Sequence, residues 1–553
     1  MLDLGRTFLQ SVERSPNSLA VVDGERRLSY GQWRDEISRL AGGLRDLGLK
    51  HGDRILVVLQ NRYEMATLHW ACQFLGIVVT PLNWRAKPEE IAYCVRDAGA
   101  LAVFYEAASA EAALQAEVDQ AVPRIAVGAS CPAGNGPRFE ALFHEVGELT
   151  PEADSEAISL MLYTSGTTGN PKGVPRRHRQ ERAAALGHVA QNLYRRGERT
   201  LGVMPLYHTM GVRSLLSMAL VDGVFVCMPR FDAEQALALI GQNQITNLYL
   251  VPTLYHDMVK RYQPDQHRIA SVRKLGFAGA SMPDGLLMRL QDMFQPELFV
   301  NHYGSSEVYT VSIEQDAMKK PGCAGRAGIN TRLRVVDLDR DSVDALAPPG
   351  VEGQIIADLR GDEAFEGYWN RPDADKKCLR DGWYFTGDIG YLDDEGDLFV
   401  TGRVDDMMIS GGENISPVDI ESVLSLHPAV DEVAVVGLKD ERWGQRVTAF
   451  IKLKADISKE DLDAHCRQSD LPNFKRPRDY LFVRDIPKSP VGKLLRRLLV
   501  AGQYELDHGS SANLGLQAEV KRSSVHTAPK APPFGGEETP DSQAGVTHDR
   551  NIS

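Results

Sequence analysis

Apolar and polar positions in the first part of the chain follow two alternating patterns. Continuous apolar runs at 54–59, 77–79 and 101–104 have the length of buried strands. Between them, residues 63–74 and 88–97 place apolar side chains at helical spacing. Strands that alternate with helices predict a parallel sheet covered on both faces. The run from 107 to 136 shows no pattern that predicts an element.

The same alternation continues beyond a polar, glycine-rich segment at 163–174. An apolar run at 158–162 predicts a buried strand before this segment, and 182–192 predicts a helix after it. Ligands of open α/β sheets bind beyond the carboxyl ends of strands. We therefore expect one site at four further strands that end in small or polar residues, in segments 201–208, 245–252, 274–281 and 298–307.

The last third of the chain contains two regions with different patterns. From about 328 to 397 short strands and turns predict a small β subdomain, and helices and strands beyond 405 predict a compact α+β unit. The predicted fold class is α/β: a large N-terminal domain of parallel-rich αβα sheets with a small β subdomain, then a small mobile α+β C-terminal domain. The predicted divisions are 1–404, 405–503 and a tail at 504–553, whose Ser-, Pro- and Gly-rich composition predicts disorder.

Composition narrows the function classes. The 553 residues carry a formal net charge of −13, which argues against a nucleic-acid partner held by a basic surface. Seven scattered cysteines without a C-x-x-C pair indicate reduced thiols, hence a cytoplasmic protein. The best apolar window, 215–228, is interrupted by Asp222 and is too short to span a bilayer, so we expect no membrane insertion.

The segment 162–174 has the composition of a loop that binds a polyphosphate. Glycines allow backbone N–H groups to face an anion, hydroxyls add donors, and Lys172 supplies a positive charge. The spacing of the common P-loop fails, because Pro171 stands where its second glycine belongs. The predicted phosphate-binding residues are Thr164, Ser165, Gly166, Thr167, Thr168, Gly169 and Lys172.

Five more motifs follow in a fixed order. They are YGSSE at 303–307, YFTGD at 384–388, GRVDD at 402–406, SGGEN at 410–414 and PVGK at 490–493. With the phosphate loop, they resemble the adenylate-forming superfamily of acyl-CoA synthetases, luciferases and peptide-synthetase adenylation domains, over roughly residues 28–497. MPLYH at 204–208 and further stretches are similar to bacterial aryl-CoA ligases, the group that includes 4-chlorobenzoate:CoA ligase.

This resemblance implies a two-step reaction. ATP would convert an aromatic or heteroaromatic carboxylic acid to an acyl adenylate, and coenzyme A would then form the thioester, with release of AMP and pyrophosphate. The resemblance assigns catalysis to Lys493, His208 and Glu307, and assigns Mg²⁺ to Glu307 and Thr164. It adds to the ATP site Gly279, Ala280, Ser281, His302, Tyr303, Gly304, Ser305, Asp388, Arg403 and Lys493.

The same resemblance implies a coenzyme A site and a hinge. Asp405 matches the hinge about which the family rotates its small domain, so that Lys493 serves the first step and the 411–412 loop the second. Trp443 can stack a ring and basic residues can pair phosphate, although Trp443 could instead be a core tryptophan. The predicted coenzyme A residues are Arg85, Gly411, Gly412, Trp443, Phe474, Lys475 and Arg476.

The implied acid pocket is more polar than that of a chlorobenzoate enzyme. Its residues are His208, Thr209, Met210, Tyr249, Ala278, Gly279, His302, Gly304, Tyr309 and Thr310. A polar or heteroaromatic ring fits such a lining better than a chlorinated one, unless His208 and His302 are structural. Arg213, four residues past Thr209, could reach a second carboxylate, but a surface or helix-packing arginine is the expectation.

Several other readings stay open from the sequence. The acid could be aliphatic, alicyclic or dicarboxylic, and the acceptor could be a carrier protein instead of coenzyme A. The chain could also be an inactive binding protein on this fold, against which intact Lys493, Glu307 and Asp388 argue. The expected partners are the small molecules, and a homodimer is possible.

Overall fold

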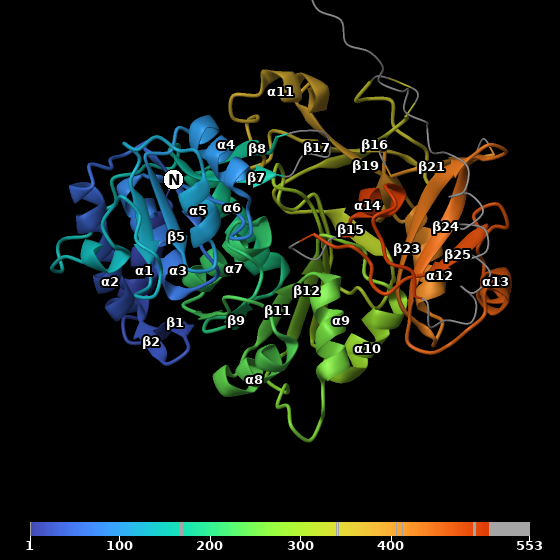
Figure 1. The fold of residues 1–553 in the computed structure, drawn as a ribbon, viewed down its shortest axis with the longest axis horizontal. Helices are drawn as coiled ribbons and strands as arrows, with labels where there is room; N and C mark the ends of the chain where they lie inside the picture. Colours follow the sequence, from blue (N-terminus) through green and yellow to red (C-terminus); the bar gives the residue numbers. More distant parts are fainter. Residues whose placement is uncertain are drawn as a thin grey trace, which may run out of the picture.

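The computed structural model describes residues 2–164, 170–338, 340, 342–404, 406–411, 413–489 and 494–507 (Figure 1). Of the predicted site, residues 165–169, Asp405, Gly412 and Lys493 lie outside the described residues, as does the tail from 508 onward. Among the described helices, none is both long and apolar enough to cross a bilayer.

The first sheet has six strands in the order β6-β5-β3-β4-β7-β8. All neighbours pair in parallel except β8, which returns antiparallel to β7, so the parallel sheet predicted for this region is confirmed. Its strands are β3 (Arg54–Val58), β4 (Val78–Pro81), β5 (Ala102–Glu106), β6 (Arg124–Val127), β7 (Ile158–Thr164) and β8 (Lys172–Arg177). The helices of this region are α2 (Tyr30–Asp46), α3 (Tyr63–Leu75), α4 (Pro88–Ala98), α5 (Ala110–Gln115) and the short η1 (Phe139–Leu142).

The second sheet has a parallel centre in the order β13-β12-β11-β9-β10-β1, and β2 forms its antiparallel edge. These strands are β1 (Leu19–Asp23), β2 (Arg26–Ser29), β9 (Arg199–Gly202), β10 (Val224–Cys227), β11 (Asn247–Leu250), β12 (Lys274–Ala278) and β13 (Leu298–Tyr303). The accompanying helices are α1 (Leu4–Arg14), α6 (His178–Gln191), α7 (Thr209–Leu220), α8 (Ala233–Asn243), α9 (Pro252–Arg261) and α10 (Asp284–Phe294). Helix α3 is buried at every position but Glu64, as an internal helix must be.

The predicted β subdomain continues the second sheet without a break. Antiparallel strands extend it in the order β14, β15, β20, β19, β17 and β16, and β18 pairs with β19. Although β14 and β15 separate β13 from β20 in this order, Tyr303 at the end of β13 reaches Asp388 of β19. The elements are β14 (Ser312–Glu314), β15 (Cys323–Ala327), β16 (Leu333–Val336), β17 (Gly353–Asp358), α11 (Pro372–Cys378), β18 (Leu379–Arg380), β19 (Trp383–Leu392) and β20 (Leu398–Arg403).

The C-terminal unit has its own five-stranded sheet and its own core. It lies beside the second sheet, in orange and red in Figure 1. Past the predicted boundary at 503, Leu506 still bridges to Val483, and the ring of Tyr504 lies 4.8 Å from that of Phe450. The elements are β21 (Met408–Ser410), β22 (Glu413–Ile415), α12 (Pro417–Ser425), β23 (Val430–Asp440), β24 (Gly444–Leu453), α13 (Lys459–Gln468), β25 (Asp479–Phe482) and α14 (Arg496–Val500).

An ion cluster joins the two domains. Asp431 of β23 lies 3.1 Å from His256 Nε2 of α9 and also pairs with Lys260 on the next turn. Its neighbour Glu432 lies 3.6 Å from His256 Nδ1 and 2.8 Å from Lys488. The register of β23 shifts between residues 430 and 432. The ammonium group of Lys488 is therefore held by Glu432 and is not simply solvated.

Candidate active site

The two ends of the phosphate loop lie where β7 ends and β8 begins. Thr164 pairs directly with Lys172 across the two strands. The Lys172 ammonium nitrogen lies 4.1 Å from the centre of the Tyr368 ring, within the range of a cation–π contact. The Tyr368 hydroxyl in turn donates to Glu307 Oε1 at 2.6 Å. The loop's lysine is therefore connected through one tyrosine to the predicted metal ligand.

Glu307 has the environment of a preformed metal ligand. It is buried, which excludes a solvated loop carboxylate, and Tyr368 holds one of its oxygens. Burial and the Glu307 carboxylate both raise the pKa of Tyr368, so that this tyrosine remains a donor. Among the described residues, no group donates to the second oxygen of Glu307. A fixed carboxylate with one open oxygen suits Mg²⁺, which prefers oxygen ligands.

A second acidic position has the arrangement expected of a ribose site. Asp388 accepts a hydrogen bond from the Tyr303 hydroxyl at 2.6 Å and pairs with Arg403 Nε at 3.1 Å. Asp388 and Arg403 are directly opposite each other on β19 and β20. Burial, followed by the Asp388 charge, raises the pKa of Tyr303 well above its usual range. Three of the predicted ATP residues thus form one hydrogen-bonded group.

Exposed backbone lies beside this group. Gly279, with φ +84°, and the exposed Ala280 and Ser281 follow β12, while Gly304 and Ser305 follow β13. The two strand ends are adjacent because Ala278 pairs with His302. A Cβ on Gly304 would lie 2.2 Å from the Tyr309 carbonyl oxygen, so only glycine fits there. These two turns present peptide groups on which a flat base could lie.

Two aromatic rings of the predicted acid pocket rest on a floor of small residues. Tyr249 pairs with Gly276, and His302 pairs with Ala278, so all four side chains are on one face of the sheet. The two ring centres are 5.0 Å apart. A Cβ on Gly276 would come within 3.0 Å of the Tyr249 ring. Small side chains on β12 therefore make room for the rings of the two neighbouring strands.

Helix α6 and the residue that follows it contribute two polar side chains, His188 and Asn192, that the sequence analysis missed. His302 Nε2 lies 3.1 Å from Asn192 Oδ1, and the ring of His188 is 5.2 Å from that of His302. Burial and the charge of Arg213 lower the pKa of His302 well below its usual range, so the ring is neutral. The helical periodicity of 182–192 gave no sign that this face meets the pocket.

Arg213 is not a surface residue, which corrects one of the two expectations for it. It is 2% exposed on α7 and donates to Thr310 Oγ1 at 2.6 Å and to the Tyr249 hydroxyl at 2.7 Å. Thr209 and Met210, at the start of the same helix, are also buried. His208 caps this helix by accepting from the Met210 N–H at 3.3 Å. The structure thus brings Arg213 together with predicted pocket residues.

A second buried arginine lies behind the pocket. Arg176 pairs with Glu181 at 2.9 Å and lies 4.0 Å from the Tyr309 ring, whose other neighbour is Arg213 at 5.6 Å. Glu363 is also buried, and no described cation lies within 4.0 Å of its carboxylate to form an ion pair. Burial raises the pKa of Glu363 to about 7, against the opposing effect of both arginines.

All but one of the described residues predicted to bind coenzyme A lie on the C-terminal domain. Trp443 is half-buried against Gly411, whose N–H donates to its carbonyl at 2.9 Å, and Arg442 and Arg478 lie 4.9 and 5.2 Å from its ring. Arg478 also lines a surface groove of 390 Å³. This volume is in the range of ligand sites. The other lining residues are Lys459, Glu460, Asp463, Arg467, Arg476, Pro477, Asp479 and Tyr480.

The remaining predicted coenzyme A residues have varied surroundings. Lys475 pairs with Asp419 at 2.6 Å, Arg476 pairs with Asp463, and Phe474 is 44% exposed. Arg85 is exposed on the large domain and lies 3.7 Å from the ring of Trp84. No contact between described residues joins Arg85 to the C-terminal groups.

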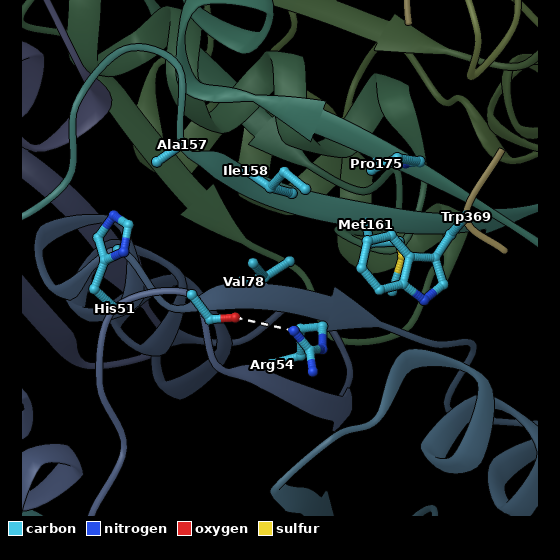
Figure 2. Close-up of a pocket in the computed structure, with 10 residues that line it drawn as sticks. His51, Arg54, Val78, Ala157, Ile158, Met161, Pro175 and Trp369 are labelled. Carbon is cyan, nitrogen blue, oxygen red and sulfur yellow. Dashed lines mark hydrogen bonds between the residues drawn. The ribbon is translucent and has the colours of Figure 1, made fainter. Parts of the chain in front are cut away.

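A small cavity behind the first sheet is not a substrate site. Its volume is 100 Å³, and it lies between β3, β4 and β7, with Trp369 and Met161 at one end and His51 at the other (Figure 2). Ligand sites of drug-sized molecules are several times larger. None of the predicted site residues lines this cavity.

Comparisons with known proteins agree with the geometry. The AMP-binding enzyme family matches residues 8–369, and the AMP-binding enzyme C-terminal domain matches 419–493. A 4-chlorobenzoate–CoA ligase of Arthrobacter is 32% identical over 88% of this chain and 93% of its own. The long-chain-fatty-acid–CoA ligase FadD13 of Mycobacterium tuberculosis is 31% identical over 90% and 98%. A solved structure of o-succinylbenzoate CoA synthetase from Bacillus subtilis, with its acyl-adenylate intermediate, has a TM-score of 0.76 at 27% identity and covers 89% of this chain and 97% of its own.

Proposed function

We propose that this chain, which belongs to the AMP-binding enzyme family and is an acid–thiol ligase that uses ATP, Mg²⁺ and coenzyme A, acts on an aromatic or heteroaromatic carboxylic acid. The observation that supports this acid class is the pair of rings, Tyr249 and His302, held 5.0 Å apart over Gly276 and Ala278. Flat rings over a floor of small residues suit a planar substrate. The relatives named above include aryl and long-chain acyl ligases, so their names do not determine the acid class. The proposal for the acid class therefore rests on the residues that line the pocket.

In the first step, a carboxylate oxygen of the acid attacks the α-phosphorus of ATP, and the bond to pyrophosphate breaks. Negative charge accumulates on phosphate, so positioning and electrostatic stabilisation supply most of the catalysis. Lys172 would pair phosphate oxygens, and Asp388 would accept from the ribose hydroxyls. Mg²⁺, held by Glu307, would neutralise phosphate charge. Lys493 is proposed to bridge the carboxylate and the α-phosphate.

In the second step, the coenzyme A thiolate attacks the acyl carbon and AMP leaves. Trp443 would stack the adenine of coenzyme A, and Arg476 and Lys475 would pair its phosphates once their acidic partners are displaced. Phe474, Gly411 and Gly412 would border the same path, with Arg85 approaching from the large domain. Rotation about Asp405 would exchange Lys493 for the 411–412 loop between the two steps.

The test is pyrophosphate release and acyl-CoA formation for a panel of aromatic and aliphatic acids, with and without coenzyme A. We expect benzoate-type and furoate-type acids to give the highest kcat/KM, with thioester formed on free coenzyme A. Lys493→Ala serves as the matched variant: it should lose adenylation yet convert a supplied acyl adenylate to thioester. A preference for aliphatic acids, or adenylate formation without transfer to coenzyme A, would overturn the proposal.

A further inference from the structure

The hydrogen bonds around Arg213 leave a surplus of donors in the acid pocket. A guanidinium has only donors, so Tyr249 and Thr310 must accept from it through their hydroxyl oxygens. Each hydroxyl hydrogen is then free to be donated onward, and no described residue accepts either one. Arg213 Nε is likewise buried without a partner. Three donors from α7, β11 and the segment after β13 therefore lack an acceptor among the residues that the structure describes.

The pairing of buried charges beside the pocket also indicates that an acceptor is missing. Of the two buried arginines beside the pocket, Arg176 has a close carboxylate partner in Glu181, whereas Arg213 donates to the neutral hydroxyls of Tyr249 and Thr310 and forms no ion pair with a described residue. Glu363 does not form an ion pair with Arg213, and burial raises its pKa to about 7, which disfavours the charged form that would pair with Arg213. Buried charges are normally paired. Arg213 therefore lacks the partner that such a buried cation normally has.

The neighbouring histidine adds one acceptor. Asn192 Oδ1 can only accept, so His302 Nε2 carries the hydrogen in their contact. In the neutral ring, Nδ1 is then an acceptor, and it is buried without a partner. A hydroxyl group could accept from the surplus donors and donate to Nδ1, whereas a carboxylate or ring oxygen could only accept.

We propose that the acid carries a second oxygen acceptor, outside the reacting carboxylate, which Arg213, Tyr249 and Thr310 recognise. This inference rests on the proposed function and specifies its substrate. The shared chemistry is an oxygen that accepts hydrogen bonds: a ring hydroxyl, a ring oxygen or a second carboxylate. Arg213 is in this account a specificity-determining residue that binds the part of the acid that does not react.

The experiment measures kcat/KM for benzoate, 3- and 4-hydroxybenzoate, 2-furoate, isophthalate and terephthalate with the full-length enzyme. The decisive quantity is the ratio of the best acceptor-bearing acid to benzoate. Arg213→Met and Tyr249→Phe should each lower this ratio about 10- to 100-fold, the range of hydrogen bonds to charged groups. The loss should appear mainly in KM, and Arg213→Lys should recover part of it. The hydroxybenzoates test a ring hydroxyl as the acceptor, 2-furoate tests a ring oxygen, and isophthalate and terephthalate test a second carboxylate.

Arg176→Lys is the matched control, because Arg176 is equally buried against the same Tyr309 ring but has its own carboxylate. It should leave the ratio unchanged, and melting temperatures establish that each variant folds. An unchanged ratio in Arg213→Met and Tyr249→Phe, with benzoate active, would overturn this inference alone. If only aliphatic acids react, the aryl proposal fails, and the same ratio is measured with succinate against butyrate. An unaffected ratio there would also overturn the inference.

Discussion

Two groups of charged side chains in this molecule are buried in different ways. One, the pocket cluster, lies inside the large domain, and the other, the interdomain cluster, joins α9 to β23. The pocket cluster is Arg176, Glu181, Arg213 and Glu363; the interdomain cluster is His256, Lys260, Asp431, Glu432 and Lys488.

The two clusters differ in how completely their charges are paired. In the pocket cluster, only Arg176 and Glu181 form a close pair. In the interdomain cluster, each carboxylate has a cation within 4.0 Å. Burial raises the pKa of Asp431, but His256 and Lys260 outweigh it and hold that pKa well below its usual range. Incomplete pairing suits a site that awaits a ligand, whereas complete pairing suits a contact that holds two domains together.

The largest effect on stability is expected from breaking the close pair of the pocket cluster. Arg176→Met would leave Glu181 as an unpaired buried charge and should lower the free energy of unfolding by about 3–5 kcal/mol. Arg176→Lys keeps the charge and should cost less. Urea denaturation followed by circular dichroism measures both. A loss below about 1 kcal/mol in Arg176→Met would show that water reaches Glu181.

An intermediate effect, dependent on pH, is expected at Glu363. Its folded pKa is raised to about 7 from the ordinary 4.5, so the folded state favours the neutral acid. The stability that the neutral form contributes is present below pH 4.5 and is lost as the pH rises through 7. Between pH 4.5 and pH 7 the free energy of unfolding should fall by at most about 3 kcal/mol from this group.

Glu363→Gln mimics the neutral acid at every pH and should remove this loss. Its melting temperature should therefore rise relative to that of the wild type between pH 5 and pH 8. Thermal scans across that range measure the difference in melting temperature between the two proteins. The contributions of all other titrating groups cancel in this difference. Parallel curves for wild type and variant would mean that Glu363 is ionised and paired in the folded state.

The smallest effect on stability is expected from the interdomain cluster. Asp431→Asn should change the free energy of unfolding by about 1 kcal/mol or less, because its partner Lys260 is 40% exposed and ion pairs with an exposed partner contribute little. If the domains alternate, it should nevertheless slow adenylation several-fold and spare thioester formation from a supplied adenylate. Rapid-quench assays measure the two half-reactions. The control is Asp485→Asn, because Asp485 pairs with Lys452 within the C-terminal domain. Equal slowing of both steps would contradict a role in domain position.

The sequence predicts local elements and motif positions but not what packs against them. The helix at 63–74 and strands such as 54–59 and 333–336 are present, because their apolar periodicity is local. The N-terminal β1 and β2 instead join the far edge of the second sheet, next to β10, a pairing over about two hundred residues that no local pattern encodes.

The candidate site shows the same division. Motif residues such as Glu307 and Asp388 could be named as candidates from sequence, because the spacing and residue types of their motifs single them out. Arg213, Asn192 and His188 could not be assigned, because whether a polar residue on a helix faces solvent or a pocket depends on tertiary packing. Gly276, which provides room for the Tyr249 ring, looks from the sequence like an ordinary strand glycine.

The irregular register of β23 at residues 430–432 has a consequence for how the enzyme should be assayed. Successive side chains of a regular strand face opposite sides, but this bulge lets Asp431 and Glu432 both reach His256. Asp431 pairs with the large domain, while Glu432 also pairs with Lys488 in its own domain. Rotation of the small domain would carry the second pair along and release the first into solvent. Dissolved salt screens such partly exposed pairs, so the balance between the two half-reactions should vary with the ionic strength of the buffer.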